Sequence, residues 1–221
     1  MFLRAFSVAF ALMLTLPAPN PAQARQIRLL AFGDSLTEGY GLKPSEGLVP
    51  RLQSWLRDRG HDVVVLNGGL SGDTTAGGRV RIGYSMARHH PDAVMVELGG
   101  NDMIAGLGVR AAEGNLGSIL SQAGQKDMPL LLVGIANPRA GAVEQAEWAA
   151  IWPRLAQRHG TLLYPDLYAP LVAQPRTRWS ELLQGDGVHA SAAGVDLIVG
   201  ALGPEVEALL AKVSLPDADG S

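Results

Sequence analysis

Short apolar runs alternate with longer amphipathic stretches along most of the chain. The runs are rich in Val, Leu and Ile and are bounded by Gly, Pro or Asp, which is the pattern of buried β-strands. We expect strands at residues 27–32, 63–66, 93–98, 130–135 and 161–164. Between and after them, apolar positions recur at helical spacing. We expect helices at residues 48–60, 74–88, 110–126 and 143–159, and a last one over 195–210 that Pro204 kinks or restarts.

Strands that are apolar at successive positions are covered on both faces. Such strands are typical of a parallel sheet between two helix layers. The pattern therefore predicts an α/β fold, a three-layer α/β/α sandwich with a parallel sheet. In folds of this kind a ligand binds at the carboxyl ends of the strands. We expect the functional site among the polar, glycine-rich segments that follow them.

The first 24 residues differ in composition from the rest. Arg4 precedes an uncharged apolar run over residues 5–16, and Ala22-Gln23-Ala24 has the small-x-small pattern of a signal-peptide cleavage site. The run is shorter than the roughly 20 apolar residues that span a bilayer. We expect a cleavable signal peptide, a mature chain from Arg25 and a periplasmic or secreted protein without stable membrane insertion. Residues 25–221 are expected to form a single domain, with a flexible tail from about residue 214.

Composition narrows the classes of partner and cofactor. The formal charge of the chain is −3, and it becomes −4 without residues 1–24, which contain one Arg and no acid. Nucleic acids bind basic surfaces, so we expect no nucleic-acid partner for this acidic chain. The chain has no cysteine, which excludes disulfides, cysteine-ligated zinc, a cysteine nucleophile and a lipid-modified N-terminal cysteine. No cluster of His and acidic residues has metal-ligand spacing. We expect no metal, no cofactor, and a monomer or weak oligomer.

Four polar segments lie at or after the expected strand ends. Gly33-Asp34-Ser35-Leu36 follows the first strand, and a segment around Gly72 follows the second. Gly99-Gly100-Asn101-Asp102 follows the third, and Asp186-Gly187-Val188-His189 comes after the fifth. Each segment alone is an ordinary turn or cap signal. Together, in this order at strand ends, they indicate one site.

These segments contain a serine nucleophile and its acid–base partners. Ser35 follows a strand where a helix is expected to begin, and the N-terminus of a helix favours developing negative charge. A serine hydroxyl needs a base to remove its proton. His189 is suited to this, because the reference pKa of imidazole is about 6.5. Asp186 can accept a hydrogen bond from one imidazole nitrogen while the other faces Ser35.

A tetrahedral intermediate on Ser35 also needs hydrogen-bond donors for its oxyanion. The candidates are the backbone N–H groups of Ser35 and Gly72 and the side-chain amide of Asn101. Glycine at position 72 leaves no Cβ between its N–H and a substrate. These residues predict acyl transfer to water through an acyl-enzyme, which is the hydrolysis of an ester or thioester.

With these segments the chain resembles the SGNH hydrolases, also called the GDSL esterase/lipase family, over roughly residues 27–212. Gly33–Gly41 and Leu70–Thr75 are most similar to the bacterial periplasmic branch, which contains arylesterases and acyl-CoA thioesterase/lysophospholipase enzymes. The resemblance implies a flavodoxin-like five-stranded sheet of order 2-1-3-4-5 and the roles given above to Ser35, Gly72, Asn101, Asp186 and His189. The chain departs from the family at Ala190, where many relatives have a proline that would tighten the turn.

Apolar residues near the oxyanion donors are expected to bind the substrate. These are Leu70, Met103, Ile104, Leu107 and Pro138. The expected substrates are small-molecule or lipid esters: aryl esters, short to medium acyl esters, acyl-CoA or lysophospholipid. Two alternatives stay open. One is a carbohydrate O-acetyl esterase, which the low aromatic content disfavours, and the other is a non-catalytic binding protein on the same fold.

Several other polar or aromatic residues are interpreted as structural. Asp34 is expected to form hydrogen bonds near the site rather than act as an acid. Ser71 is the rival nucleophile, but it lacks the strand-to-helix junction of Ser35. Trp148 and Trp152, four residues apart, are expected to pack on one helix face. No Gly-x-Ser-x-Gly elbow, Walker loop or dinucleotide fingerprint is present.

Overall fold

The computed structural model, which describes residues 25–136 and 141–214, contains a five-stranded parallel sheet of order β2-β1-β3-β4-β5. The strands are β1 (Ile27–Gly33), β2 (Val63–Gly69), β3 (Ala93–Glu97), β4 (Leu130–Val133) and β5 (Leu162–Tyr164). The predicted α/β class and the flavodoxin-like strand order are both confirmed. The order reverses beside β1, so the carboxyl ends of β1 and β3 flank the position where such folds bind ligands.

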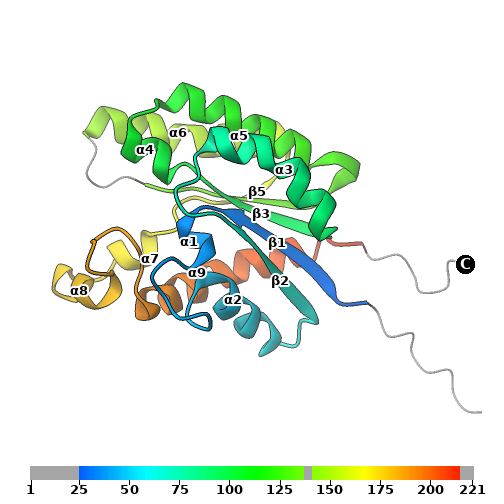
Figure 1. Ribbon diagram of the computed structural model, residues 1–221, viewed down its shortest axis with the longest axis horizontal. Helices are drawn as coiled ribbons and strands as arrows, with labels where there is room; N and C mark the ends of the chain where they lie inside the picture. Colours follow the sequence, from blue (N-terminus) through cyan, green and yellow to red (C-terminus); the bar gives the residue numbers. More distant parts are fainter. Residues whose placement is uncertain (1–24, 137–140, 215–221) are drawn as a thin grey trace, which may run out of the picture.

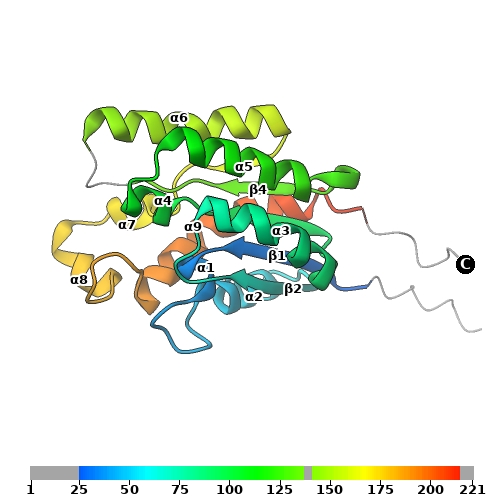
Figure 2. The same cartoon turned by 45° about the horizontal axis from the view of Figure 1, so that its top comes forward.

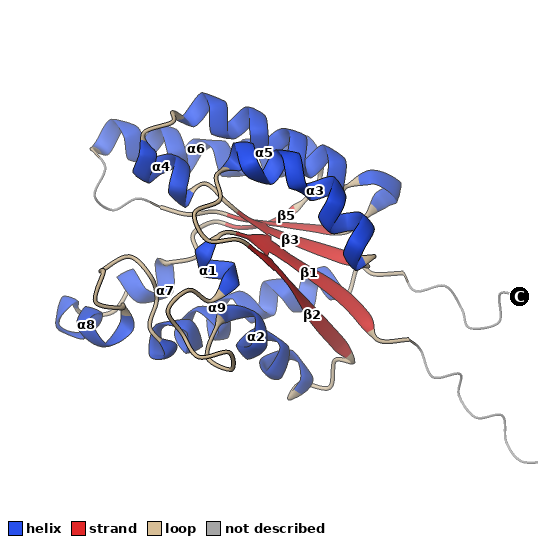
Figure 3. Ribbon diagram, viewed as in Figure 1, coloured by secondary structure: helices blue, strands red, loops and turns tan. Residues whose placement is uncertain are grey.

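Helices cover both faces of this sheet, as the red strands between blue helices show in Figure 3. One face is covered by α3 (Thr75–His89), α5 (Val109–Ala123) and α6 (Ala142–His159), and the other by α2 (Leu48–Arg57) and α9 (Ala192–Leu210) (Figure 1). Shorter helices lie towards the carboxyl ends of the strands (Figure 2). They are α1 (Ser35–Glu38), α4 (Gly100–Ala105), α7 (Ala169–Val172) and α8 (Trp179–Leu182). A 3₁₀ turn at Arg176–Arg178 precedes α8, and another at Gln125–Asp127 precedes β4.

Strand β1 shows why this sequence needs two helix layers. Leu29 and Ala31 belong to the core on the α2–α9 side, whereas Leu30 and Phe32 belong to the core on the α3–α5–α6 side. All four side chains are fully buried. Burying one large apolar side chain stabilises the fold by about 1.5–3 kcal/mol, so a strand with apolar residues on both faces is stable only between two layers.

Helix α9 runs through Pro204 as one element, so the expected restart there was wrong. The residue before a proline is normally kept out of helical geometry by a clash between its Cβ and the proline ring. Here that residue is Gly203, which has no Cβ. The ring of Trp55 occupies this space, since a Cβ on Gly203 would lie 2.6 Å from it.

The predicted signal peptide, residues 1–24, and the tail from residue 215 lie outside the described residues. Among the helices that are described, none combines the length and apolar character needed to cross a membrane.

Candidate active site

Ser35 is the first residue of α1 and comes directly after the junction with β1. Asp34 caps this helix, because its carboxylate accepts a hydrogen bond of 3.0 Å from the N–H of Leu36. Gly39, at φ +90°, ends the helix after one turn. The expected strand-to-helix junction is therefore present, and Asp34 has the structural role expected of it.

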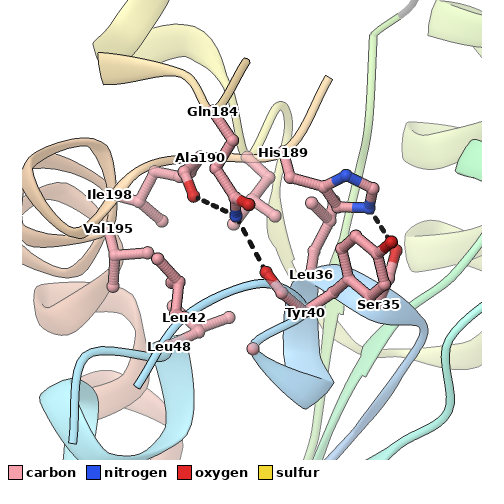
Figure 4. A pocket seen from close by; sticks show the side chains of 12 residues that line it. Ser35, Leu36, Tyr40, Leu42, Leu48, Gln184, His189, Ala190, Val195 and Ile198 are labelled. Atoms are coloured by element: carbon pink, nitrogen blue, oxygen red, sulfur yellow. Dashed lines mark hydrogen bonds between the residues drawn. The ribbon is translucent and has the colours of Figure 1, made fainter. Parts of the chain in front are cut away.

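The other two predicted catalytic residues lie next to Ser35. The His189 Nε2 atom is 2.8 Å from the Ser35 hydroxyl oxygen, and its Nδ1 atom is 2.6 Å from Oδ2 of Asp186. The other carboxylate oxygen of Asp186 accepts the N–H groups of Val188 and His189, at 2.9 and 3.0 Å. The short Asp186–His189 turn therefore holds the imidazole with one nitrogen facing the carboxylate and the other facing the serine. Figure 4 shows the contact between the imidazole and Ser35.

The same hydrogen bonds decide the charge of Asp186. Its partial burial by itself raises the pKa of this carboxyl. The hydrogen bonds from the His189 ring and from the N–H groups of Val188 and His189 outweigh burial and lower the pKa to about 2. Asp186 is therefore a carboxylate at neutral pH, which is the state that stabilises an imidazolium.

Backbone and side-chain hydrogen bonds hold the turn around His189, where Ala190 takes the place of the proline discussed above. The N–H of Gln184 donates to the carbonyl of His189 at 2.8 Å, and the N–H of Ser191 donates to the carbonyl of Leu182 at 2.9 Å. From the other side, the Tyr168 hydroxyl donates to the carbonyl of Val188 at 2.8 Å. These bonds fix the backbone on both sides of the imidazole.

Gly72 lies in the loop after β2 with its backbone at φ +79°. A Cβ at this position would meet no protein atom within 4 Å, so the left-handed backbone rather than lack of space requires glycine. Next to it, both the N–H and the hydroxyl of Ser71 donate to the carboxylate of Glu38. Within the described residues, the N–H groups of Gly72 and Ser35 have no acceptor in the protein.

Asn101 projects from the first turn of α4 towards the same place. Its side-chain nitrogen donates to the carbonyl of Asp73 at 2.8 Å and to the carboxylate of Asp34 at 3.3 Å. The bond to Asp73 connects the amide to the loop that contains Gly72. The structure thus brings together all five residues that the sequence predicts for catalysis and for the oxyanion.

Arg81 on α3 is a residue of this region that sequence reasoning missed. Its guanidinium donates to the carbonyls of Gly33 and Gly68 at 2.6 and 2.7 Å, and to the carboxylate of Asp73 at 2.6 Å. It also lies over the ring of Phe32. One side chain therefore joins the ends of β1 and β2 to the loop of Gly72. Nothing in the local pattern distinguishes it from Arg79, two residues earlier, which is exposed.

A buried acid, Glu97, contacts Thr37 of α1 and was also missed. It is fully buried at the end of β3, and one carboxylate oxygen accepts a hydrogen bond of 2.7 Å from the Thr37 hydroxyl. The other oxygen has no partner among the described residues. Burial, with the nearby Asp34 carboxylate, raises the pKa of Glu97 well above its ordinary value. Burial likewise raises the pKa of Asp34 to about 6, against the opposing effects of the Leu36 N–H and His189.

We expect Glu97→Gln to reduce the loss of stability that accompanies a rise in pH. The folded protein holds the Glu97 proton more tightly than the unfolded chain, so this group stabilises the fold at low pH. The stabilisation from Glu97 declines between the ordinary pKa of 4.5 and the raised pKa of the folded protein. In this range the free energy of unfolding falls by up to about 1.4 kcal/mol per pH unit. Urea unfolding at several values between about pH 5 and pH 8 gives the unfolding free energy of wild type and variant at each pH. The dependence of that free energy on pH is then compared between the two proteins.

The surface substitution Glu181→Gln is the matched control for this experiment, because position 181 is exposed. If wild-type and Glu97→Gln proteins gave parallel curves of unfolding free energy against pH, Glu97 would not be a buried proton-binding group.

The predicted substrate-binding residues lie in different surroundings. Met103 is buried and lines a hollow of about 420 Å³ between α4, the start of α5 and the first turns of α6. Ile104, Leu107 and Leu70 are 70%, 48% and 51% exposed, so they can contact only a substrate that lies over the surface. Pro138 is outside the described residues.

A second, smaller hollow of about 20 Å³ opens directly beside Ser35 and His189 (Figure 4). Apolar side chains form most of its wall: Leu36, Leu42, Leu48, Leu167, Val195 and Ile198. It has room for about one water-sized group, so it is too small for an acyl chain.

Comparison with known proteins relates this geometry to a family. Residues 31–197 match the sequence model of the GDSL-like Lipase/Acylhydrolase family. Esterase TesA of Pseudomonas aeruginosa is 32% identical over 85% of this chain and 92% of that protein. A crystal structure of TesA matches 82% of this chain and 99% of its own length with a TM-score of 0.76 and 31% identity.

Two further relatives are similar over somewhat less of the chain. An arylesterase of Vibrio mimicus is 31% identical over 73% of this chain and 79% of that protein. Thioesterase 1/protease 1/lysophospholipase L1 of Escherichia coli K12 is 32% identical over 73% of this chain and 74% of that protein.

Proposed function

Since this chain belongs to the GDSL-like lipase/acylhydrolase family and is an ester-hydrolysing enzyme, we propose that it acts through a covalent acyl-enzyme on Ser35. The observation that carries the proposal is the unbroken chain of contacts from Ser35 through His189 to Asp186, at 2.8 and 2.6 Å. A serine at this distance from an imidazole can lose its proton as it attacks a carbonyl.

In the first half of the reaction, the Ser35 oxygen bonds to the substrate carbonyl carbon while His189 Nε2 takes the hydroxyl proton. The carbonyl π electrons move to the oxygen, which becomes the oxyanion. When the electrons return, the bond to the leaving oxygen or sulfur breaks and His189 gives that atom the proton. Asp186 stabilises the imidazolium between these two transfers. A water molecule then repeats the sequence on the acyl-enzyme and releases the carboxylic acid.

The oxyanion is proposed to bind the N–H groups of Ser35 and Gly72 and the amide of Asn101. Two observations support this set. The two backbone N–H groups have no acceptor within the described part of the protein. The Asn101 amide is oriented by the carbonyl of Asp73, one residue after Gly72. The two backbone N–H groups are oriented before the reaction and stabilise a developing charge without a cost of rearrangement. Asn101 donates its second N–H to the Asp34 carboxylate at 3.3 Å, and the oxyanion would replace that long hydrogen bond.

We propose aryl esters, short to medium acyl esters, acyl thioesters and lysophospholipids as the substrate classes. The names of the arylesterase and of the thioesterase/lysophospholipase relative support these classes. The hollow lined by Met103 is the proposed site of the acyl chain, because it begins one residue after Asn101 and holds about 420 Å³. A chain-length series of nitrophenyl esters, measured beside acyl-CoA and lysophospholipid, ranks these classes. The sequence of residues 1–24 supports a periplasmic or secreted location.

Labelling with a fluorophosphonate tests the nucleophile directly. This probe forms a covalent bond only with an activated serine, so we expect one phosphonyl group per chain, attached to Ser35 by peptide mass spectrometry. Ser71→Ala removes the rival serine of the neighbouring loop and is the matched control, which should label at the wild-type rate. Labelling that persists in Ser35→Ala, or that maps to Ser71, would refute the assignment.

A further inference from the structure

Tyr40 is a solvent-exposed aromatic residue next to the proposed base. Its ring centroid lies 4.7 Å from that of the His189 imidazole, with the planes tilted by 40° (Figure 4). The residue is 52% exposed, so a ligand at the site can reach it. The mechanism described above makes no use of this residue.

The tetrahedral intermediate shows which part of a substrate would meet this ring. Of its substituents, the oxyanion points to Gly72 and Asn101, and the leaving atom must reach Nε2 of His189 to receive its proton. The leaving group must therefore extend past the imidazole, and Tyr40 is an exposed aromatic residue whose ring contacts that imidazole. The acyl chain takes the remaining direction, towards the hollow lined by Met103.

We propose that Tyr40 contacts the leaving group and makes the enzyme prefer aromatic over alkyl leaving groups. An aryl group beside a tyrosine ring can adopt an offset or edge-to-face arrangement, which contributes beyond simple burial, whereas an alkyl group cannot. Tyr40 is thus a specificity-determining residue for the leaving group. This inference rests on the proposed function, because it requires His189 to protonate the leaving atom.

The backbone of Tyr40 is fixed from both neighbouring segments, which favours a binding role. Its N–H donates to the carbonyl of Ser35 at 3.0 Å, and its carbonyl accepts a hydrogen bond of 2.8 Å from the side-chain amide of Gln184. The same amide nitrogen donates to the carbonyl of Ala190 at 3.0 Å (Figure 4). Gln184 therefore ties the serine turn to the histidine turn, and the backbone that carries the ring is held before a substrate arrives. Little backbone order then has to be gained on binding.

The test compares Tyr40→Leu with Tyr40→Phe on two acetate esters. Phenyl acetate and hexafluoroisopropyl acetate share the acyl group and have leaving groups of similar acidity, but only one is aromatic. We expect Tyr40→Leu to lower the ratio of kcat/KM for the phenyl ester to that for the alkyl ester by about 3- to 10-fold. Tyr40→Phe keeps the ring and should keep the ratio. Tyr40→Met gives the same comparison if the leucine variant does not fold.

Two controls separate leaving-group contact from other roles of the ring. Because Tyr40 also packs on His189, its loss can lower the rates for all substrates, so the ratio rather than the rate is decisive. The ratio between phenyl acetate and phenyl butyrate should not change, since the acyl chain lies on the other side. An equal loss for both leaving groups, or a change confined to the acyl ratio, would overturn the proposal. A wild-type enzyme that is not labelled by fluorophosphonate at Ser35 would instead overturn the proposed function.

Discussion

Replacing Ser35 with alanine is expected to lower kcat for ester hydrolysis by about 10⁴- to 10⁶-fold. The substitution removes the only protein atom proposed to bond to the substrate carbon. It should leave the fold intact, because the Ser35 hydroxyl has its hydrogen bond with His189 rather than with the core. Hydrolysis of a nitrophenyl ester measures the loss, and the melting temperature shows that the protein is folded.

His189→Ala should cost nearly as much, and the double variant should be no slower than either single one. A nucleophile and its base act as one unit, so once either is lost, removal of the other lowers the rate little further. Additive losses would indicate that the two residues act independently and would contradict the proposed mechanism. Ser71→Ala, in the adjacent loop, is the control and should retain wild-type kcat.

Asn101→Ala is expected to lower kcat by about 10²- to 10³-fold with a smaller change in KM. The amide is proposed to bind the oxyanion, which carries full charge only after the substrate has been attacked. An interaction of this kind stabilises the transition state more than the bound ester, so its loss appears in kcat. Steady-state kinetics on one ester, over a range of concentrations, separate the two constants.

The control for this prediction must remove an asparagine amide elsewhere. Asn115 on α5 is suited, because its side-chain nitrogen donates to the Thr75 hydroxyl at 3.1 Å and it has no place in the proposed oxyanion site. Asn115→Ala can affect stability but should leave kcat close to that of the wild type. If Asn101→Ala raised KM and left kcat unchanged, Asn101 would bind the substrate and the transition state equally well. It would then have no specific effect on the oxyanion.

Local patterns were sufficient to predict most of the fold. The β1 run from Ile27 predicts a strand buried on both faces because apolar residues occupy consecutive positions, and the sheet shows this burial. Helix α4 was not predicted, because six residues are too few for a helical period to be visible. Pro204 was interpreted by its usual effect on helices, and the glycine before it, packed against Trp55, permits a continuous α9.

For the site, the chain itself determined that a serine, a glycine and an asparagine follow strands, and that an Asp-x-x-His turn comes near the C-terminus. The first three are local features, since each depends on a strand that ends and a loop that begins. The Asp-x-x-His turn follows α8 rather than a strand, so the packing of the helices places it at the site. Only the tertiary structure decided that Arg81 ties the loop of Gly72 to two strands, that Glu97 is fully buried, and that Tyr40 lies beside His189. Contacts such as the one between positions 35 and 189, 154 residues apart, depend on how the layers pack. No short window of sequence contains that information.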